Sequence, residues 1–314
     1  MRILFWGTPE FAVPSLRALQ EEGHAVVAVV TQPDRPAGRG RHLRESPVKR
    51  EAEKEGIPVL QPDKPRGEAF LHEIAAMEPD LSVVAAYGHI LTDEVLALPR
   101  LGSVNVHASL LPALRGAAPV NWAIILGHSH SGVTIMRMVR ELDAGPILYR
   151  VATPLPDDIS AGELYLMLSE MGATALIEAL AQMEAGVLEE SEQEHDRATF
   201  APKLARDDAR VDWALEAGEL DRWIRGCDPW PAAWSEIDEH PVQIFRSEVV
   251  EEGPEGGPPA APGTVLLADA RAGLEVATGN GRLRIGEVKP AGKGRMPASA
   301  WIAGRGVTEG DRFH

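Results

Sequence analysis

The chain has 314 residues, more than the roughly 100–200 residues of an ordinary domain, so we expect two domains. Its composition, 44% hydrophobic and 25% charged, is typical of globular proteins and excludes wholesale disorder, collagen-like repeats and coiled coils. The formal net charge of −16 argues against unspecific nucleic-acid binding, although it leaves room for a local basic patch.

The single cysteine, Cys227, excludes a disulfide framework and a cysteine-rich metal site. No continuous apolar run approaches the ~18–20 residues that a membrane span requires, and the start of the sequence has no pattern of a secretory signal. We therefore expect a cytoplasmic protein that does not associate with a membrane.

The first 150 residues alternate short β-branched runs with helical stretches, which predicts a Rossmann-like, open and mainly parallel α/β sheet. The expected strands cover residues 3–6, 25–31, 57–60, 80–86, 102–107 and 132–138. The expected helices cover residues 11–22, 47–55, 67–77, 93–98 and 161–185.

The texture of the sequence changes after the last of these helices. Residues 189–197 are acidic and poor in apolar side chains, which indicates a linker. A helical pattern at 211–226 is followed by short expected strands at 241–246, 263–267, 273–277 and 282–288, which predicts a small β-barrel. We therefore expect an α/β domain at 1–188, a linker at 189–206 and a barrel domain at 207–314.

Asn105 and His107 are two residues apart at the end of an apolar strand, so their side chains share one face of the sheet. In open α/β sheets, ligands bind beyond the carboxyl ends of the strands, where this pair would lie. A simple cap of the strand end is the alternative. The stiff Ser-Leu-Leu-Pro loop at 109–112, and the carboxylate of Asp143 downstream, favour a functional site.

Several segments resemble methionyl-tRNA formyltransferases, in order and over essentially the whole chain. They are Gly7-Thr8-Pro9-Glu10-Phe11, the segment Gln-Pro-Asp-Arg-Pro-Ala-Gly-Arg-Gly at 32–40, residues 105–112, residues 132–136, Leu142-Asp143 and Asp228-Pro229-Trp230-Pro231. The resemblance implies transfer of the formyl group from N10 of 10-formyltetrahydrofolate to the amine of methionine on initiator tRNA, a step that supports translation initiation.

The resemblance also implies roles for individual residues. Asn105, His107 and Asp143 match the catalytic set, while Ser109, Leu110, Leu111 and Pro112 match the loop that lies against the folate. Attack of an amine on the formyl carbon creates a negative oxygen, which a neutral amide such as Asn105 can stabilise. His107 can donate a hydrogen bond or carry a proton. Asp143 either favours the charged imidazolium or accepts the proton of the attacking amine, and the sequence does not separate these roles.

Two segments are basic although the protein as a whole is acidic. Residues 33–50 carry six basic and two acidic residues (+4), and residues 271–306 carry seven and two (+5). A solvated surface loop is the plain interpretation of the first segment. The resemblance implies instead that it contacts the tRNA acceptor end and that an OB-like second domain holds the tRNA. The expected tRNA-binding residues are Arg35, Arg39, Arg41, Arg44, Lys289, Lys293 and Arg295.

Other features favour no further cofactor. The turn after the first strand lacks G-x-G-x-x-G, so we expect no nucleotide cofactor, and no third ligand accompanies His128 and His130, so we expect no metal. Trp230 and Trp234 are expected in the core of the second domain. Val139, Glu141 and Pro146 depart from the family pattern around Asp143.

Two alternatives stay open. Another folate-dependent formyltransferase or hydrolase could use the same catalytic set, although the arginine-rich segment and the basic barrel favour the tRNA enzyme. A non-catalytic tRNA-binding protein with the same fold is the second alternative, which the three catalytic residue types disfavour. Nothing in the sequence requires more than a monomer.

Overall fold

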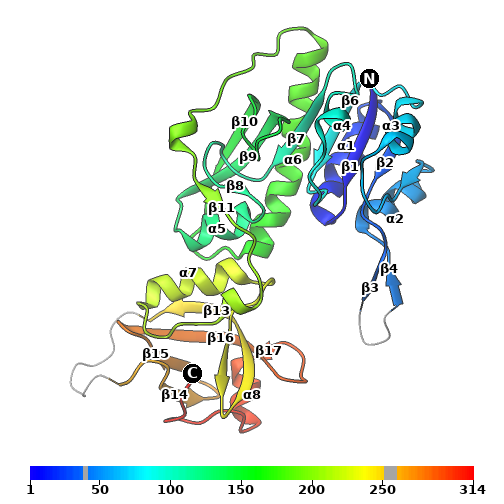
Figure 1. Cartoon of the computed structure of the whole chain (residues 1–314). Helices are drawn as coiled ribbons and strands as arrows, with labels where there is room; N and C mark the ends of the chain where they lie inside the picture. The colour runs from blue at the N-terminus through cyan, green and yellow to red at the C-terminus, as the bar shows by residue number, and fades with distance from the viewer. Residues whose placement is uncertain (38–41, 251–259) are drawn as a thin grey trace. The chain divides into compact units, whose positions relative to one another are not determined.

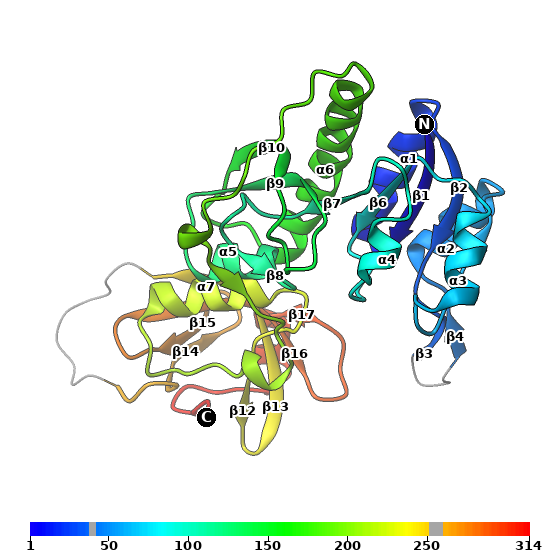
Figure 2. The same ribbon diagram turned by 45° about the horizontal axis from the view of Figure 1, so that its top comes forward.

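The computed structural model describes residues 1–37, 42–250 and 260–314, which form two compact units (Figures 1 and 2). The first unit comprises Met1–Pro119, His130–Pro154 and Tyr165–Ala201. The second comprises Val120–Ser129, Leu155–Leu164 and Pro202–His314. The chain therefore passes between the units several times before it continues into the second one.

A mixed, mostly parallel sheet organises the first unit, with the strand order β10-β9-β7-β6-β1-β2-β5. The neighbours from β5 to β7 pair in parallel, whereas β9 pairs antiparallel with β7 and β10 antiparallel with β9. This confirms the expected Rossmann-like sheet. Its strands are β1 (Arg2–Gly7), β2 (Ala25–Val30), β5 (Val59–Leu60), β6 (Leu81–Ala85), β7 (Ser103–His107), β9 (His130–Arg137) and β10 (Ile147–Pro154).

Helices cover both faces of this sheet. On one face, Trp6 and Val84 pack in a buried cluster with Phe70 of α3 (Glu68–Ala75) and with Leu96 of α4 (Asp93–Leu96). On the opposite face, α6 (Ala161–Glu184) approaches so closely that a Cβ atom on Gly172 would lie 2.9 Å from Val106. The remaining helices of this unit are η1 (Glu10–Ala12), α1 (Val13–Glu21), α2 (Pro47–Lys54) and η2 (His195–Arg197).

The expected helix at 47–55 is confirmed, and its start has a local cause. The hydroxyl of Ser46 accepts a hydrogen bond from the backbone N–H of Lys49 at 3.0 Å, and Pro47 occupies the first turn. Both features are favoured at helix N-termini, because they satisfy or remove backbone donors that lack an intrahelical partner.

Short strands appear where the sequence analysis expected none. The first part of the basic segment at 33–50 was interpreted as a surface loop, yet it contains β3 (Arg35–Ala37), which pairs antiparallel with β4 (His42–Arg44). β10 was also missed. Away from the main sheet, β8 (Arg115–Gly116) pairs in parallel with β11 (Phe200–Ala201).

The second unit is built on an antiparallel sheet with the order β12-β13-β16-β15-β14, and β17 adds to β16. Residues 311–314 hydrogen-bond to Gly263 and Val265 at the β14 edge and to Glu236 in β12, so they connect the two edges as in a small barrel. The elements are α5 (Pro119–Ile125, nearly all in this unit), η3 (Asp207–Ala209), α7 (Ala217–Cys227), β12 (Trp234–Ile237), β13 (His240–Val249), β14 (Val265–Asp269), β15 (Gly273–Ala277), β16 (Arg282–Pro290), β17 (Met296–Pro297) and α8 (Ala298–Ala303).

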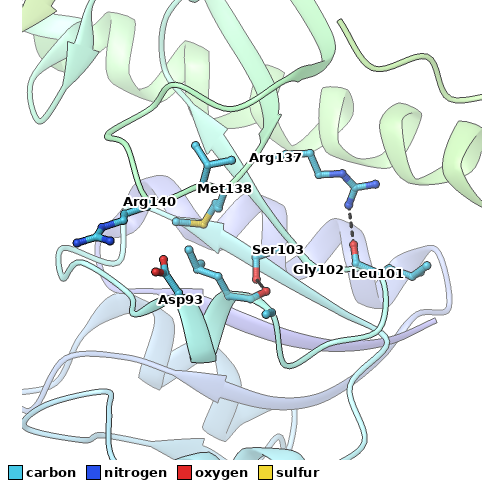
Figure 3. Close-up of a pocket in the computed structure, with 10 residues that line it drawn as sticks. Asp93, Leu101, Gly102, Ser103, Arg137, Met138 and Arg140 are labelled. Atoms are coloured by element: carbon cyan, nitrogen blue, oxygen red, sulfur yellow. Dashed lines mark hydrogen bonds between the residues drawn. The ribbon is translucent and has the colours of Figure 1, made fainter. Parts of the chain in front are cut away.

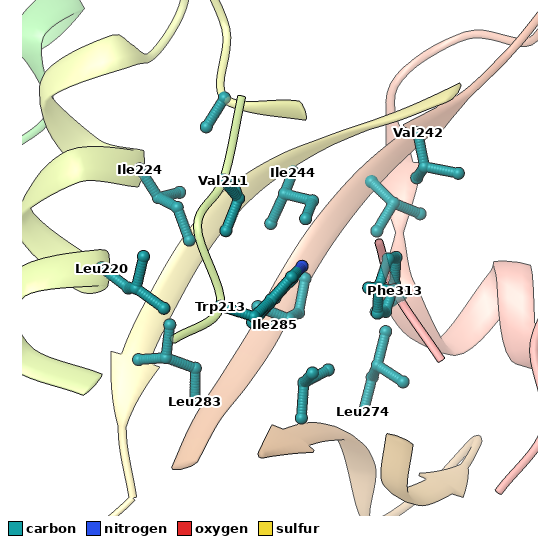
Figure 4. Close-up of a cluster of buried hydrophobic side chains, with 14 of the residues drawn as sticks. Val211, Trp213, Leu220, Ile224, Val242, Ile244, Leu274, Leu283, Ile285 and Phe313 are labelled. Carbon is teal, nitrogen blue, oxygen red and sulfur yellow. The ribbon is translucent and has the colours of Figure 1, made fainter. Parts of the chain in front are cut away.

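The core of this unit explains one wrong prediction. The helix expected at 211–226 begins only at Ala217, because Val211 and Trp213 alternate like strand residues and both point into the buried cluster drawn in Figure 4. Trp213 stacks near Phe313 with ring centroids 5.3 Å apart, and its indole N–H donates to the Ser235 hydroxyl. These contacts outweigh the local helical pattern.

One helix in the described part of the chain, α6, is long and apolar enough to cross a membrane by length and composition alone. Half of its most apolar window is buried in the structure. Leu164, Leu168, Leu176 and Leu180 have no solvent-exposed surface. A core helix accounts for this pattern.

Candidate active site

The strand β7 places Asn105 and His107 on one face of the sheet, as the sequence predicted. Asn105 pairs with Val84 of β6 and with Met136 of β9, so it lies in the middle of the sheet. Side chains alternate along β7, and Val104 and Val106 point to the face that α6 covers. Asn105 therefore lies on the opposite face, which α3 and α4 cover. Among the described residues, no partner hydrogen-bonds to the half-buried Asn105 amide, which is therefore free to bind a ligand oxygen.

A hydrogen bond to a backbone carbonyl fixes the tautomer of His107. Its side chain is buried, and Nε2 lies 3.0 Å from the carbonyl oxygen of Leu114. A carbonyl oxygen can only accept, so Nε2 carries a hydrogen and donates it. The other nitrogen, Nδ1, is then the atom that gains or loses a proton. It lies 3.7 Å from Oδ2 of Asp143.

Asp143 lies in the loop between β9 and β10, in the left-handed backbone conformation at φ 50°. This conformation is uncommon for residues other than glycine, and Asp and Asn tolerate it better than most. Oδ2 accepts a hydrogen bond of 2.8 Å from the backbone N–H of Gly116. The structure thus brings Asn105, His107 and Asp143 to one place, although Asp143 and His107 are not in direct hydrogen-bond contact.

The side chain of Thr134, in β9, holds the Ser-Leu-Leu-Pro loop through hydrogen bonds to its backbone. The buried Thr134 hydroxyl donates to the Ser109 carbonyl at 2.7 Å and accepts from the Leu111 N–H at 3.1 Å. Ser109 and Leu111 are themselves buried, whereas Leu110 and Pro112 are half-buried. Ser109 and Leu111 therefore shape the loop, and only Leu110 and Pro112 offer side-chain surface to a ligand.

A cavity of about 320 Å³ opens beside the same face of β7 (Figure 3). Ser103, which lines it, points to the same side of the strand as Asn105, about 7 Å away along the strand. In the view of Figure 3 the Asp93 carboxylate and the Arg140 guanidinium lie on one side and Arg137 on the other. The cavity is lined by Asp93, Leu96, Ala97, Leu101, Gly102, Ser103, Arg137, Met138, Val139 and Arg140.

Most of these lining residues belong to no sequence motif, so they could not be predicted from the sequence. They become neighbours only because α4, the start of β7 and the end of β9 lie side by side in the fold. Two hydrogen bonds stiffen the wall: the Ser103 hydroxyl donates to the Leu96 carbonyl, and Arg137 donates to the Leu101 carbonyl. Among the described residues, no group of three or more His, Cys, Asp or Glu side chains is arranged to hold a metal ion.

Two of the expected tRNA-binding residues of the first unit, Arg35 and Arg44, lie on the β3–β4 pair. Arg35 and Arg44 are directly opposite each other in its register, and both are exposed. Arg35 donates one hydrogen bond to the Gln32 side chain at 2.8 Å. Arg39 and Arg41 lie outside the described residues. The described pair therefore presents two guanidinium groups to solvent.

In the second unit, Arg295 is committed to internal partners. Its guanidinium binds both carboxylate oxygens of Asp228 at 2.7 and 2.9 Å, contacts Glu287, and lies over the Phe245 ring at 4.0 Å from the centroid. Lys289 and Lys293 are exposed. The free positive charge of this unit is therefore smaller than the residue count of 271–306 suggested.

Of the two tryptophans expected in the core of the second unit, one lies on the surface and the other packs against the core. Trp230 is 65% exposed, so its assignment to the core was wrong. Trp234 packs partly against the core, and its indole N–H donates to the Arg206 carbonyl at 2.8 Å. Cys227 is fully buried, and burial raises the pKa of its thiol to about 12.

Comparison with known proteins identifies related folds. HypX from Aquifex aeolicus in complex with tetrahydrofolic acid is similar over 98% of this chain and 48% of its own, at 21% identity and a TM-score of 0.65. An N-formyltransferase from Helicobacter canadensis in complex with folinic acid and dTDP-3-aminofucose is similar over 91% and 98%, at 15% identity and a TM-score of 0.67. Methionyl-tRNA formyltransferase from Clostridium thermocellum is similar over 80% of this chain and 94% of its own, at 14% identity and a TM-score of 0.55.

The present chain spans about half the length of the HypX structures that it matches. Residues 1–180 match the family model described as formyl transferase, and residues 203–306 match the model described as formyl transferase, C-terminal domain. Together these matches cover most of the sequence, so the chain belongs to the formyl transferase family.

Proposed function

We propose that this protein transfers the formyl group of 10-formyltetrahydrofolate to the amine of methionine carried on initiator tRNA. The observation that carries the proposal is the proximity of three groups: the Asn105 amide, which has no hydrogen-bond partner among the described residues, the His107 imidazole with one proton fixed, and the Asp143 carboxylate that faces it. Membership of the formyl transferase family supports the reaction class.

The cavity beside β7 fits the donor. Folate carries a flat pterin ring, which needs apolar walls and a few polar groups at its edge. Leu96, Met138 and Val139 supply apolar surface, and the loop backbone and Asp93 supply polar groups. Ser103 in the wall of the cavity lies two residues before Asn105 on the same face of β7, so a pterin here would lie about 7 Å from the Asn105 side chain. The tetrahydrofolic acid and folinic acid complexes of the two similar structures support a folate donor.

In the proposed reaction, Asn105 stabilises the negative charge that forms on the formyl oxygen. The amine nitrogen bonds to the formyl carbon, the carbonyl oxygen becomes negative, the bond from carbon to N10 breaks, and the proton lost by the amine ends on N10. The Asn105 amide donates a hydrogen bond to the negative oxygen. A donor of this kind typically lowers the barrier by ~2.7–4 kcal/mol, because it strengthens as charge develops.

His107 and Asp143 handle the proton. The Leu114 carbonyl holds the Nε2 hydrogen, so only Nδ1 can take up or release a proton during the reaction. Oδ2 of Asp143 is held by the Gly116 N–H, which leaves Oδ1 with no hydrogen-bond partner in the described part of the chain. The carboxylate can therefore receive the amine proton or stabilise the imidazolium, and the second role requires it to face His107.

The choice of methionyl-tRNA as acceptor rests on charge and on the second unit. Arg35 and Arg44 project two guanidinium groups from β3 and β4, a form suited to binding phosphates. The second unit is a small antiparallel barrel with exposed Lys289 and Lys293, a scaffold often used for oligonucleotides. The likeness to the Clostridium thermocellum methionyl-tRNA formyltransferase adds support.

A panel of acceptors tests the proposal. The protein is incubated with 10-formyltetrahydrofolate and one of three amines: methionyl-tRNA, free methionine or dTDP-3-aminofucose. We expect formylation of methionyl-tRNA at a rate far above that of free methionine. Preferential formylation of the amino sugar would retain the family chemistry and reject the tRNA acceptor, whereas no transfer to any amine would reject the proposed reaction.

A further inference from the structure

The strand β9 ends far from His107, although the loop that follows β9 carries Asp143, which lies beside His107. Arg137, the last residue of β9, pairs with Val104, which lies three residues before His107 along β7. The loop of residues 138–146 must therefore bring Asp143 back by about 10 Å. The pairing of β9 with its neighbours does not reach this loop, so contacts from elsewhere in the chain must set the position of Asp143.

Gln193 makes contacts of this kind. Its amide Nε2 lies 2.9 Å from the carbonyl oxygen of Asp143 and 2.7 Å from that of Gly145. The Gln193 side chain is 4% exposed, so water does not compete effectively for these two hydrogen bonds. One side chain thus pins the backbone on both sides of Ala144.

The orientation of the Gln193 amide follows from Arg115. The oxygen Oε1 accepts from Nε and Nη2 of Arg115 at 3.1 and 2.6 Å. A guanidinium only donates, so the amide oxygen must face Arg115 and the amide nitrogen must face the two loop carbonyls. Arg115 is itself buried and also donates to His195, and its neighbour Gly116 holds the Asp143 carboxylate.

The same stretch of chain supports the other partner of His107. The backbone N–H of Leu114 donates to the Thr199 hydroxyl at 2.9 Å, and Thr199 also hydrogen-bonds to Arg115 and Pro112 through its backbone. The Leu114 carbonyl is the group that fixes the His107 tautomer. Residues 191–201, which the sequence analysis assigned to a linker, therefore contact both loops that define the His107–Asp143 pair.

We propose that Gln193 is a positioning residue for formyl transfer: it holds the loop of residues 138–146 so that the Asp143 carboxylate faces His107. The inference rests on the catalytic role proposed above for Asp143. Gln193 lies outside both family matches, which end at residue 180 and resume at residue 203. It acts through Asp143 and does not touch the reacting atoms.

Gln193→Glu is the decisive variant. A glutamate can still accept from Arg115, so the buried arginine keeps a partner, but it cannot donate to the Asp143 and Gly145 carbonyls. We expect kcat to fall about 10- to 100-fold, with little change in KM for the folate donor. Glu192→Ala, an exposed neighbour, is the matched control and should retain wild-type kcat.

Two readouts separate positioning from a general structural role. In a crystal structure of Gln193→Glu, we expect the Asp143 carboxylate displaced from its 3.7 Å approach to His107. In the Asp143→Asn background, we expect Gln193→Glu to cause no further loss of kcat, because its effect passes through that carboxylate. An unchanged loop in the crystal, or losses that multiply in the double variant, would overturn the proposal.

The crystallographic readout needs no acceptor, so it stands even if methionyl-tRNA proves not to be the substrate. Failure of the proposed function would appear in the wild-type protein as absence of methionyl-tRNA formylation. Failure of the present inference would appear as an undisturbed Asp143 loop in the variant. The two results are therefore distinguishable.

Discussion

The Nδ1 atom of His107 lies 3.7 Å from Oδ2 of Asp143, while the opposite ring nitrogen is tied to the Leu114 carbonyl. This arrangement assigns the mobile proton of the imidazole to the side that faces the carboxylate. The Asn105 amide, two residues away on the same strand face, has no competing partner in the described part of the chain. The site thus separates a donor for the oxyanion from a pair that handles the proton.

Replacing Asn105 with alanine tests the oxyanion donor. We expect kcat to fall by about 10²–10³, because the hydrogen bond strengthens only as negative charge develops. The affinity for 5-formyltetrahydrofolate, measured by calorimetry, should stay close to that of the wild-type protein. Single-turnover formyl transfer at the wild-type rate would show that Asn105 is not the donor.

Replacing Asp143 with asparagine tests the carboxylate with little change of shape. Asparagine tolerates the left-handed backbone conformation at φ 50°, and its amide oxygen can still accept from the Gly116 N–H. We expect kcat to fall by about 10²–10⁴, with a melting temperature near that of the wild-type protein. If activity survives in this variant, the charge of Asp143 has no part in the reaction.

The sequence predicted the parts of this site that depend on local periodicity. Asn105 and His107 share a face because side chains alternate along any strand, and the strand itself was evident from its apolar residues. The order of the sheet and the direction of β9 were not accessible in this way. They depend on which strands pair although they are far apart in the sequence, and tertiary packing determines this pairing.

Gln193 is a clearer example of a site residue that cannot be predicted from the sequence. Its segment is acidic and poor in apolar residues, a pattern that also describes an exposed linker, yet this one side chain is buried. A single buried polar residue leaves no periodic pattern in the sequence. Similarly, Trp213 was placed in a helix because local helical residues surround it, whereas the barrel core draws it into an extended segment.

Replacing both Arg35 and Arg44 with alanine tests the acceptor contact. If they bind tRNA phosphates, the slope of log KM for methionyl-tRNA against log salt should fall by about 1 for each arginine removed. The KM for the folate donor should not change. Arg100→Ala is a suitable control, because Arg100 is also exposed but pairs with Asp80 at 2.7 Å. An equal change in the control would indicate an unspecific charge effect.

The thiol of Cys227 should be inert in the folded protein. Burial raises its pKa to about 12, so the thiol is almost fully protonated at neutral and mildly alkaline pH. At pH 8 a group with this pKa is a thiolate in about one molecule in 10⁴. We expect no reaction with a disulfide reagent at pH 8 until urea unfolds the protein, when one thiol per chain should react. Rapid reaction of the native protein would contradict this burial.

Gly145 should tolerate no side chain, because a Cβ atom there would lie 2.1 Å from the Arg137 carbonyl oxygen. Gly145→Ala must therefore displace the loop at the point where Gln193 binds it, and the Asp143 carboxylate moves with it. We expect a loss of kcat comparable to that of Gln193→Glu, together with a lower melting temperature because of the steric conflict. Gly294→Ala is the control, since nothing lies within 4 Å of the added atom. A Gly145→Ala protein with full activity would mean that Asp143 keeps its place without this loop conformation, so the link between the loop and the reaction would be lost.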